Sequence, residues 1–294
     1  MVAQGENNDR VLGKKVENKF VYDPSLLRKE ARLDNRKNII GSRFSMPFFG
    51  MDIWHCYEVS WLDPCGKPQN FILKICYPAS SEYIVESKSL KLYLNSLNQT
   101  MFVSPMSVLK VVGDDLTKLL ECHVVVSAFP LSYNMSNLLL SDSRYPLLEN
   151  LISKEVTINE FEKENPGLLD RKPSNEPFFV HSTSLRSRCK VTGQPDWGDL
   201  FIYMKGGDVP TFDSLYKYII SLRNECHFHE EIVETVYMRL LETFHPRDLG
   251  VFACYTRRGG IDINPMRASD ISVLNLLSLR LLSPDQLSLR TIRQ

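Results

Sequence analysis

The sequence predicts an α+β protein made of two copies of one unit, and three observations carry this prediction. Alternating apolar residues on both sides of a turn-rich segment are typical of antiparallel strands joined as a hairpin. Apolar residues spaced by three and four positions follow and indicate an amphipathic helix. The same succession of patterns returns about 125 residues further along the 294-residue chain.

The elements of the first unit can be placed by these patterns. Strands are predicted at 57–62 and 70–77, on either side of the turn residues 63–68. A second helical stretch at 108–120 leads into a short apolar run at 124–129, which is typical of a buried strand. The first helix precedes that stretch, and its apolar face consists of Leu90, Tyr93, Leu94 and Leu97.

The second unit repeats this order. Strands are predicted near 178–184 and 200–205, and an apolar run at 249–255 is followed by a turn and a further strand at 261–263. The helix of this unit has an apolar face of Leu215, Tyr218, Ile219 and Leu222. We therefore divide the chain into an N-terminal arm (1–45), a first module (46–152), a linker rich in Glu, Asn, Lys and Pro (153–177) and a second module (178–294).

The two helices match residue by residue. Ser89, Tyr93 and Ser96 correspond to Ser214, Tyr218 and Ser221 at a constant offset of 125. We interpret the match as an internal duplication, with chance similarity of two amphipathic helices as the alternative.

The polar residues beside these helices differ between the halves. Glu86-Ser87-Lys88 precedes the helix in the first half and Thr211-Phe212-Asp213 in the second. His227-Phe228-His229-Glu230 follows only the second helix. This complementary loss favours one composite site built from both halves.

Composition excludes several classes of protein. With 43% hydrophobic residues the chain can bury a large core, so disordered and fibrous classes are excluded. Lys+Arg 35 balance Asp+Glu 35, which argues against a nucleic-acid binder or a membrane-surface protein. The N-terminal residues lack the apolar core of a signal peptide and no stretch is long enough for a membrane span, so we expect a soluble, cytoplasmic protein. The arm is basic (Arg28, Lys29, Arg32, Arg36, Lys37 and Arg43) and is expected to be extended or a surface helix.

The richest candidate for chemistry is the segment from Cys189 to Gly198. Its Gly and Pro residues disfavour a helix, so the chain can turn back and bring Asp196 near Cys189. The flanking Arg188 and Lys190 would favour a nucleophilic thiolate, with Asp196 as acid or base. The structural alternative is a buried thiol beside a turn that Asp196 caps. The chain has seven cysteines and no CxxC pair, so most are expected to be reduced thiols.

Two further segments carry polar groups at close spacing. His227 and His229, with Cys226 or Glu230, offer zinc ligands; the alternatives are a polar helix start, or a carboxylate that reads a purine-like edge. Arg257-Arg258-Gly259-Gly260 is predicted to be a hairpin tip that holds phosphate or is simply solvated. No GxGxxG or P-loop pattern occurs in the sequence, which argues against those nucleotide sites.

Five strings resemble one family closely. They are Glu86 to Lys91 (ESKSLK), Phe129 to Ser136 (FPLSYNMS), Cys189 to Gly198 (CKVTGQPDWG), Phe228 to Glu230 (FHE) and Tyr255 to Pro265 (YTRRGGIDINP). The chain resembles the NADPH-dependent 7-cyano-7-deazaguanine reductases, the nitrile reductases of queuosine biosynthesis, in their long two-module form. The resemblance implies two tandem tunnelling-fold (T-fold) modules, with antiparallel sheets and helices on one face, assembled as a homodimer.

The resemblance also implies a reaction and its residues. The nitrile of 7-cyano-7-deazaguanine would be reduced to the aminomethyl group with two NADPH, without a metal and without nucleic acid as a partner. Cys189 would form a covalent thioimide and Asp196 would donate a proton to the nitrile nitrogen. Val85, Glu86, Ser87, His229 and Glu230 would bind the substrate, and Ser87, Lys88, Arg258 and Gly259 would contact the cofactor. A zinc-dependent cyclohydrolase and a non-catalytic purine- or pterin-binding module remain as alternatives.

Overall fold

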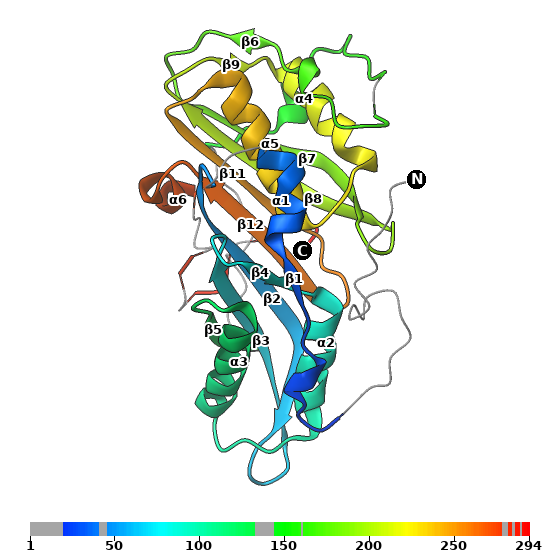
Figure 1. Cartoon of the computed structure of the whole chain (residues 1–294), viewed down its shortest axis with the longest axis vertical. Coiled ribbons are helices and arrows are strands. Elements are labelled where there is room, and N and C mark those ends of the chain that lie inside the picture. The colour runs from blue at the N-terminus through cyan, green and yellow to red at the C-terminus, as the bar shows by residue number, and fades with distance from the viewer. Residues whose placement is uncertain are drawn as a thin grey trace.

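One long sheet runs through the whole molecule (Figure 1). The computed structural model describes residues 20–40, 46–132, 144–159, 161–277, 282–283, 286–288 and 290–294. In these residues the sheet has eight strands in the order β10-β7-β8-β11-β12-β2-β3-β5, with only β10 parallel to its neighbour. The strands are β2 (Phe49–Leu62), β3 (Pro68–Pro78), β5 (Val125–Pro130), β7 (Phe178–Cys189), β8 (Pro195–Lys205), β10 (Cys226–His227), β11 (Asp248–Tyr255) and β12 (Ile261–Ala268).

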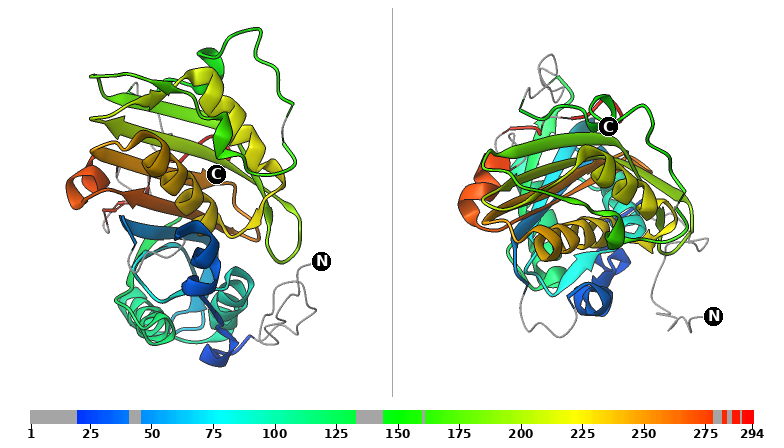
Figure 2. Two further views of the ribbon diagram at one scale, coloured as in Figure 1. Left: turned by 45° about the horizontal axis from the view of Figure 1, so that its top comes forward. Right: turned by 90° about the horizontal axis from the view of Figure 1, so that it is seen from above.

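Four helices cover one face of the sheet. Helices α2 (Ser87–Ser96) and α3 (Pro105–Leu120) pack on the first-half strands over a core that includes Trp54 and Tyr93. Helices α4 (Phe212–Ser221) and α5 (His229–Phe244) pack on the second-half strands, as the left view of Figure 2 shows. The predicted α+β class is confirmed.

Smaller elements complete the fold. Helix α6 (Ile271–Leu277) and Tyr145 cover part of the opposite face of the sheet, where they pack against Phe201 and Phe252. Helix α1 (Arg32–Ile40) lies beside α5 where the two halves meet (Figure 2). Among the described residues, no helix combines the length and hydropathy that a membrane span needs.

The repeated order of elements predicted from the sequence is confirmed. Helices α2 and α4 begin at Ser87 and Phe212, 125 residues apart, and each ends in a 3-10 turn, Leu97–Gln99 and Leu222–Asn224. The hairpins β2–β3 and β7–β8 each carry an irregularity of register at a matched place, between Cys56 and Val59 and between Ser182 and Leu185. β2 and β12 pair along their length, so the two halves share one continuous sheet.

The repeat extends into the segments predicted to be arm and linker. Asp23 and Asn165 each cap a 3-10 turn, Pro24–Leu26 and Pro166–Leu168. The backbone N–H group of Asp23 donates to the Ser96 hydroxyl of α2, and that of Asn165 donates to the Ser221 hydroxyl of α4, at 3.2 Å in both halves. Each segment then forms a short strand, β1 (Lys29–Ala31) on β4 (Tyr83–Val85) and β6 (Arg171–Lys172) on β9 (Val209–Pro210).

These matched contacts identify a sequence repeat that hydrophobic periodicity does not reveal. Asp-Pro-Ser-Leu-Leu at 23–27 corresponds to Asn-Pro-Gly-Leu-Leu at 165–169. In both, an Asx side chain accepts from the backbone two residues on and proline supplies the first turn position. We infer that the repeated unit begins at these segments, rather than at 46 and 178.

The expectation that the basic arm lies on the surface is wrong for two of its arginines. Arg32 and Arg36, one helical turn apart, are 3% and 7% exposed. Arg32 pairs with Asp52, and Arg36 donates to both oxygens of Glu234 at 2.7 and 2.8 Å. Arg267 joins the two carboxylates, at 2.8 Å from each. Buried charges persist when they are paired in this way, so the arm is anchored in the interior. Residue Arg43 lies outside the described residues.

The predicted strands around the Cys189 segment were too short. β7 continues to Cys189 and β8 starts at Pro195, so the segment is a hairpin tip rather than an irregular loop. The strands continue because Ser187 and Arg188 pair with Asp196 and Pro195 across the hairpin.

Candidate active site

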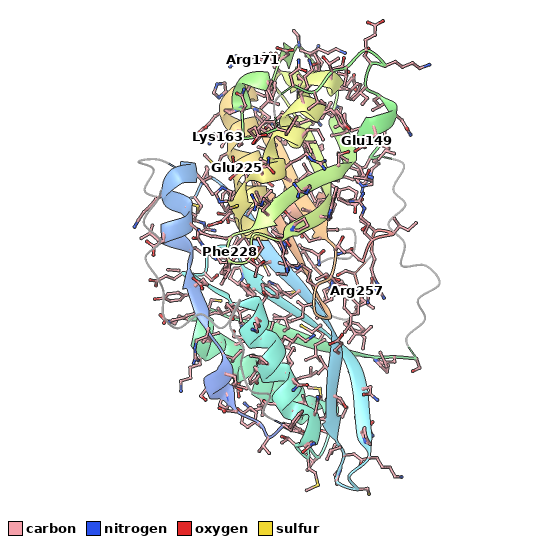
Figure 3. All side chains as sticks on the ribbon, turned by 90° about the vertical axis from the view of Figure 1, so that its right-hand side faces the viewer. Glu149, Lys163, Arg171, Glu225, Phe228 and Arg257 are labelled. Carbon is pink, nitrogen blue, oxygen red and sulfur yellow. The ribbon has the colours of Figure 1, made fainter. Side chains whose placement is uncertain are left out.

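A cavity of about 360 Å³ lies where the two halves meet. Figure 3 shows Phe228, one of its lining residues, at this junction. All ten site residues predicted from the sequence line this one cavity: Val85, Glu86, Ser87, Lys88, Cys189, Asp196, His229, Glu230, Arg258 and Gly259. The first half supplies four of these residues, from β4 and the start of α2. The second half supplies the other six, from the β7–β8 hairpin, the start of α5 and the β11–β12 turn. The structure therefore brings the predicted residues together into one composite site.

The β7–β8 hairpin positions the thiol and the first carboxylate. The backbone of Cys189 accepts from Gly193 at 2.9 Å and donates to Gln194 at 2.8 Å, which closes the turn. Gly193 has a φ of 66°, a conformation that favours glycine. Cys189 and Asp196 are 7% and 4% exposed and face the same cavity. The structure describes all seven cysteines as free thiols.

Two basic side chains contact the Asp196 carboxylate. Arg258 Nη1 lies 2.5 Å from Oδ1, and His229 Nε2 lies 3.5 Å from Oδ2. Burial alone would raise the pKa of Asp196, but the hydrogen bond and charge of His229, together with Arg258, hold it below its usual value. In the free protein Asp196 is therefore an ionised carboxylate at neutral pH.

The two cations next to Cys189 in sequence do not serve its thiol as predicted. Lys190 Nζ is held by Asn35 at 2.6 Å and by Glu231 at 3.0 Å. Arg188 Nε donates to the Gly193 carbonyl at 3.1 Å. Side chains alternate along a strand, so Arg188 faces away from Cys189, and the charge of Lys190 is already neutralised. The N-terminus of α5 and Arg258 are positive groups that share the cavity with Cys189.

Glu86 is the carboxylate that the first half contributes. It is 2% exposed and caps α2, because its side chain accepts from the Ser89 N–H at 2.7 Å. Its own N–H donates to the Arg28 carbonyl at 2.9 Å, so the arm strand β1 fixes its position. Ser87 and Lys88 follow as the first residues of α2 and line the same cavity.

Glu230 and His229 are the first residues of α5. Glu230 is 4% exposed, and its buried Oε1 has no hydrogen-bond partner in the described structure. Burial, reinforced by the negative charge of Asp52, raises the pKa of Glu230 to about 7 against the opposing charges of His229 and Arg32. The His229 ring stacks on Tyr255 with a centroid distance of 3.8 Å. A buried acceptor atom that faces the cavity is suited to a ligand N–H group.

The residues proposed as zinc ligands do not converge. Cys226 is exposed and its thiol donates to the Asn224 carbonyl. Burial would lower the pKa of His227, but hydrogen bonds to Glu225 and Glu231 raise it to about 9, so its imidazole is protonated at neutral pH and is held by two carboxylates. Within the described residues, no three His, Cys, Asp or Glu side chains form a metal-binding group.

Two interpretations of the acidic pair Glu230 and Glu231 are a polar helix start and a carboxylate that contacts a ligand, and each residue fits one of them. Glu231 caps α5, with Oε2 accepting from the Phe228 N–H at 2.8 Å, which confirms a polar helix start. Glu230 instead lines the cavity.

The β11–β12 turn places only one of its two arginines in the cavity. Arg258 lines it, whereas the Arg257 guanidinium lies 4.5 Å from the centre of the Tyr57 ring. Gly259 has a φ of 57°, and a Cβ there would come within 3.1 to 3.7 Å of the Lys91 side chain. Lys91 therefore lies against the β11–β12 turn, and Lys88 and Arg258 line the same cavity. Cationic side chains of this kind can pair with phosphate groups.

Sequence reasoning did not assign several lining residues to this site: Trp54, Ile84, Lys91, Gln194, Phe228, Ile261 and Ile263, and it considered His227 only as a zinc ligand. Lys91 is one turn after Ser87 on α2, and this spacing could have identified it. The apolar members looked like ordinary core residues because a site wall and a core use the same side chains.

A cavity of this size, with a thiol, carboxylates and cations in its lining, is typical of an enzyme that acts on a small molecule. Comparison with known proteins gives the family. Residues 19–128 match the family described as "Nitrile reductase, 7-cyano-7-deazaguanine-reductase N-term", and residues 195–272 match "QueF-like protein".

Curated relatives cover nearly the whole chain. The NADPH-dependent 7-cyano-7-deazaguanine reductase of Rickettsia bellii (strain OSU 85-389) is 37% identical over 90% of this chain and 94% of its own length. Those of Desulfotalea psychrophila and Acinetobacter baumannii (strain AYE) are each 39% identical, over 88% and 89% of this chain and 92% and 94% of their own lengths. The chain belongs to the family of NADPH-dependent 7-cyano-7-deazaguanine reductases.

A solved structure is also similar. The archaeosine synthase QueF-Like in its apo form matches 34% of this chain and 98% of its own, with 16% identity and a TM-score of 0.29.

Proposed function

We propose that this protein reduces the nitrile of 7-cyano-7-deazaguanine to the aminomethyl group with NADPH, through a covalent thioimide on Cys189. Membership of the reductase family supports the reaction. The observation that carries the residue roles is that Cys189, Asp196, Glu86 and Glu230 all line one cavity at the junction of the two halves.

Cys189 and Asp196 would perform the first step together. The Cys189 thiolate adds to the nitrile carbon as a carbon–sulfur bond forms and one carbon–nitrogen bond of the nitrile opens. Negative charge grows on the nitrogen, and a proton from Asp196 neutralises it. The product is the thioimide, with Asp196 left as carboxylate. Because the nitrile carbon is a weak electrophile, both groups are needed at the same place.

Glu86 and Glu230 would read the base of the substrate from opposite sides of the junction. An ionised carboxylate accepts two hydrogen bonds, as the N–H edge of a guanine-like base requires. Both carboxylates are almost fully buried. Glu86 Oε2 already accepts from the Ser89 N–H, whereas Glu230 Oε1 has no partner in the described structure, so a ligand that offers it no N–H group would leave that oxygen unpaired at a cost of about 1–3 kcal/mol. Val85, Ser87 and His229 line the cavity beside them.

Two NADPH molecules, each supplying one hydride when bound, would convert the nitrile carbon into an amine carbon. Ser87, Lys88, Arg258 and Gly259, with Lys91, would hold each NADPH, and the flanking cations suit its phosphate groups. After the first reduction Cys189 leaves as thiolate and an imine forms. Because imines hydrolyse, the apolar residues Trp54, Ile261 and Ile263 of the lining would keep bulk water from it.

The chain would act as a homodimer, without metal or nucleic acid. The balance of 35 basic and 35 acidic residues supports a small neutral substrate rather than a polynucleotide. In the described part of the sheet, the end strand β5 pairs with β3 alone, which leaves an edge that a second copy can extend.

The reaction can be tested directly. Incubation with 7-cyano-7-deazaguanine and NADPH under reducing conditions should bleach the near-ultraviolet absorbance of the reduced nicotinamide, with two NADPH consumed per nitrile. Ligand binding without NADPH oxidation would instead indicate a non-catalytic module. If a chelator abolished the enzymatic activity of the protein and added zinc restored it, the result would support the cyclohydrolase alternative.

A further inference from the structure

Arg258 contacts the residue that the proposed reaction needs as its acid. Its Nη1 lies 2.5 Å from Asp196 Oδ1, and its Nη2 donates to the Gln194 side chain. Both contacts come from the β7–β8 hairpin, whereas Arg258 stands on the β11–β12 turn. The Arg258 side chain keeps 38% exposure, and Asp196 keeps 3%. A half-exposed cation therefore closes over an almost fully buried carboxylate.

This contact conflicts with the role of proton donor. The charged and titratable groups around Asp196 are His229 from α5, Arg258 from the turn, and Tyr255 from β11, with Cys189 and Glu230 in the same cavity. Arg258 and the His229 ring among them stabilise the carboxylate, which has no proton to give. One of them must be withdrawn before Asp196 can act as an acid near neutral pH.

Arg258 is the cation that can leave. His229 is held by its stack on Tyr255, and Tyr255 is fully buried. Arg258 has no such packing, and it lines the same cavity as Lys88 and Lys91, so a nucleotide phosphate bound there would meet several cations. A guanidinium that turns toward a phosphate gives up its carboxylate, because both ligands need the same N–H donors.

We propose that Arg258 is a positioning residue that alternates between Asp196 and a phosphate of the bound nucleotide, so that nucleotide binding frees Asp196 to take up a proton. This inference rests on the proposed function. It assigns to one side chain the coupling between cofactor binding and proton transfer to the nitrile nitrogen. Cys189 then adds to the nitrile most readily when the hydride donor is already in place.

The test is the rate of adduct formation on Cys189 at pH 7, with 7-cyano-7-deazaguanine alone and with oxidised NADP⁺, which has no hydride to give. The adduct is measured by mass spectrometry of the intact chain. In the wild-type protein Asp196 is almost wholly ionised at this pH, so the rate should follow its small protonated fraction. NADP⁺ should raise the pKa of Asp196 by about one unit and so make the reaction about tenfold faster.

Variants separate Arg258 from other causes. Without NADP⁺, Arg258→Gln should already react about tenfold faster than wild type at pH 7, since loss of a neighbouring positive charge raises the pKa of an acid. NADP⁺ should then accelerate it no further. Arg258→Lys, which retains the charge, should restore part of the response. Arg247→Gln removes an exposed arginine that pairs with Asp248 and should behave as wild type.

Two results would overturn the inference: equal rates at pH 7 in Arg258→Gln and wild type without NADP⁺, or a wild-type rate that NADP⁺ does not raise. Absence of any adduct at every pH in the wild type is a different result, because it contradicts the proposed function itself.

Discussion

The two halves of the chain fold alike but carry different side chains where their helices begin. Glu86 caps α2 through the Ser89 N–H at 2.7 Å, and Thr211 caps α4 through the Ser214 N–H at 3.2 Å. At the start of the other helices, Ser104 caps α3, whereas Phe228, His229 and Glu230 begin α5. Both halves thus keep the same helix starts. At each matched pair of helix starts, only one of the two halves places a reactive or ligand-binding side chain there.

The difference shows how one site arises from two copies of a fold. The N-cap positions of α2, α3 and α4 accept Glu, Ser or Thr without change of fold, because each side chain supplies an oxygen to an N–H of the first helical turn. The first half used the α2 cap for a carboxylate, and the second used the α5 start for His229 and Glu230. Because β2 pairs with β12, these two helix starts face one cavity.

The largest predicted effect comes from exchange of the matched caps. Glu86→Thr installs the residue that the second half uses, so α2 should stay capped while the base-reading carboxylate is lost. We expect kcat/KM for the nitrile to fall about 10³-fold, which is about 4 kcal/mol of binding to two N–H groups. The measurement is steady-state NADPH oxidation.

The reciprocal exchange is the control. Thr211→Glu should fold and react as wild type, since Glu86 shows that glutamate caps this position. Equal losses in both exchanges would contradict the assignment of Glu86 to the substrate.

The second prediction concerns the buried charge of Arg32 in the arm, which the matching position of the second half lacks. Arg32 pairs with Asp52, whereas Ser174 stands at the corresponding position of the second half. Arg32→Gln should lower the free energy of unfolding by about 3 kcal/mol, the lower end of the cost of breaking a buried pair, because Arg267 remains with Asp52. Urea denaturation would measure it.

Lys37→Gln on the same helix removes an exposed partner of Asp34 and should leave the urea midpoint unchanged. If Arg32→Gln also left the midpoint in place, the arm would be no part of the folded core.

The third and smallest effect uses the raised pKa of Glu230, about 7. Below that pH the carboxyl is protonated and accepts fewer hydrogen bonds, so kcat/KM should fall about tenfold between pH 8 and pH 6. Glu230→Gln removes the titrating group, and this acid limb should vanish from the profile of the variant. An unchanged limb in Glu230→Gln would assign the titration to another residue.

Patterns of apolar residues and turn signals were enough to predict the hairpins, the four main helices and the duplication. The resemblance to a family supplied ten residues that the structure gathers in one cavity, although their roles remain predictions. Arg32 and Arg36 were misplaced because a charged residue is expected at the surface unless its partner is known, and Asp52 and Glu234 lie far away in sequence.

Lys190 shows the same difficulty at close range. Its position next to Cys189 indicated a cation that would activate the thiol, but Asn35 and Glu231 bind its ammonium group. Residues that are neighbours in the sequence have neighbouring backbones, but a long side chain can still bind a partner on another element. The Asn-Pro-Gly-Leu-Leu and Asp-Pro-Ser-Leu-Leu repeat was visible in the sequence, and it could have shown that arm and linker are the same element.

The central claim is that a thiol from the second half attacks a substrate held by a carboxylate from the first. Mass spectrometry of the protein with 7-cyano-7-deazaguanine and no NADPH tests it most directly. We predict one adduct per chain, mapped to Cys189, absent in Cys189→Ala, retained when the exposed Cys226 is replaced by Ala, and strongly reduced in Glu86→Thr. An adduct that persists in Cys189→Ala, or forms undiminished in Glu86→Thr, would contradict this account.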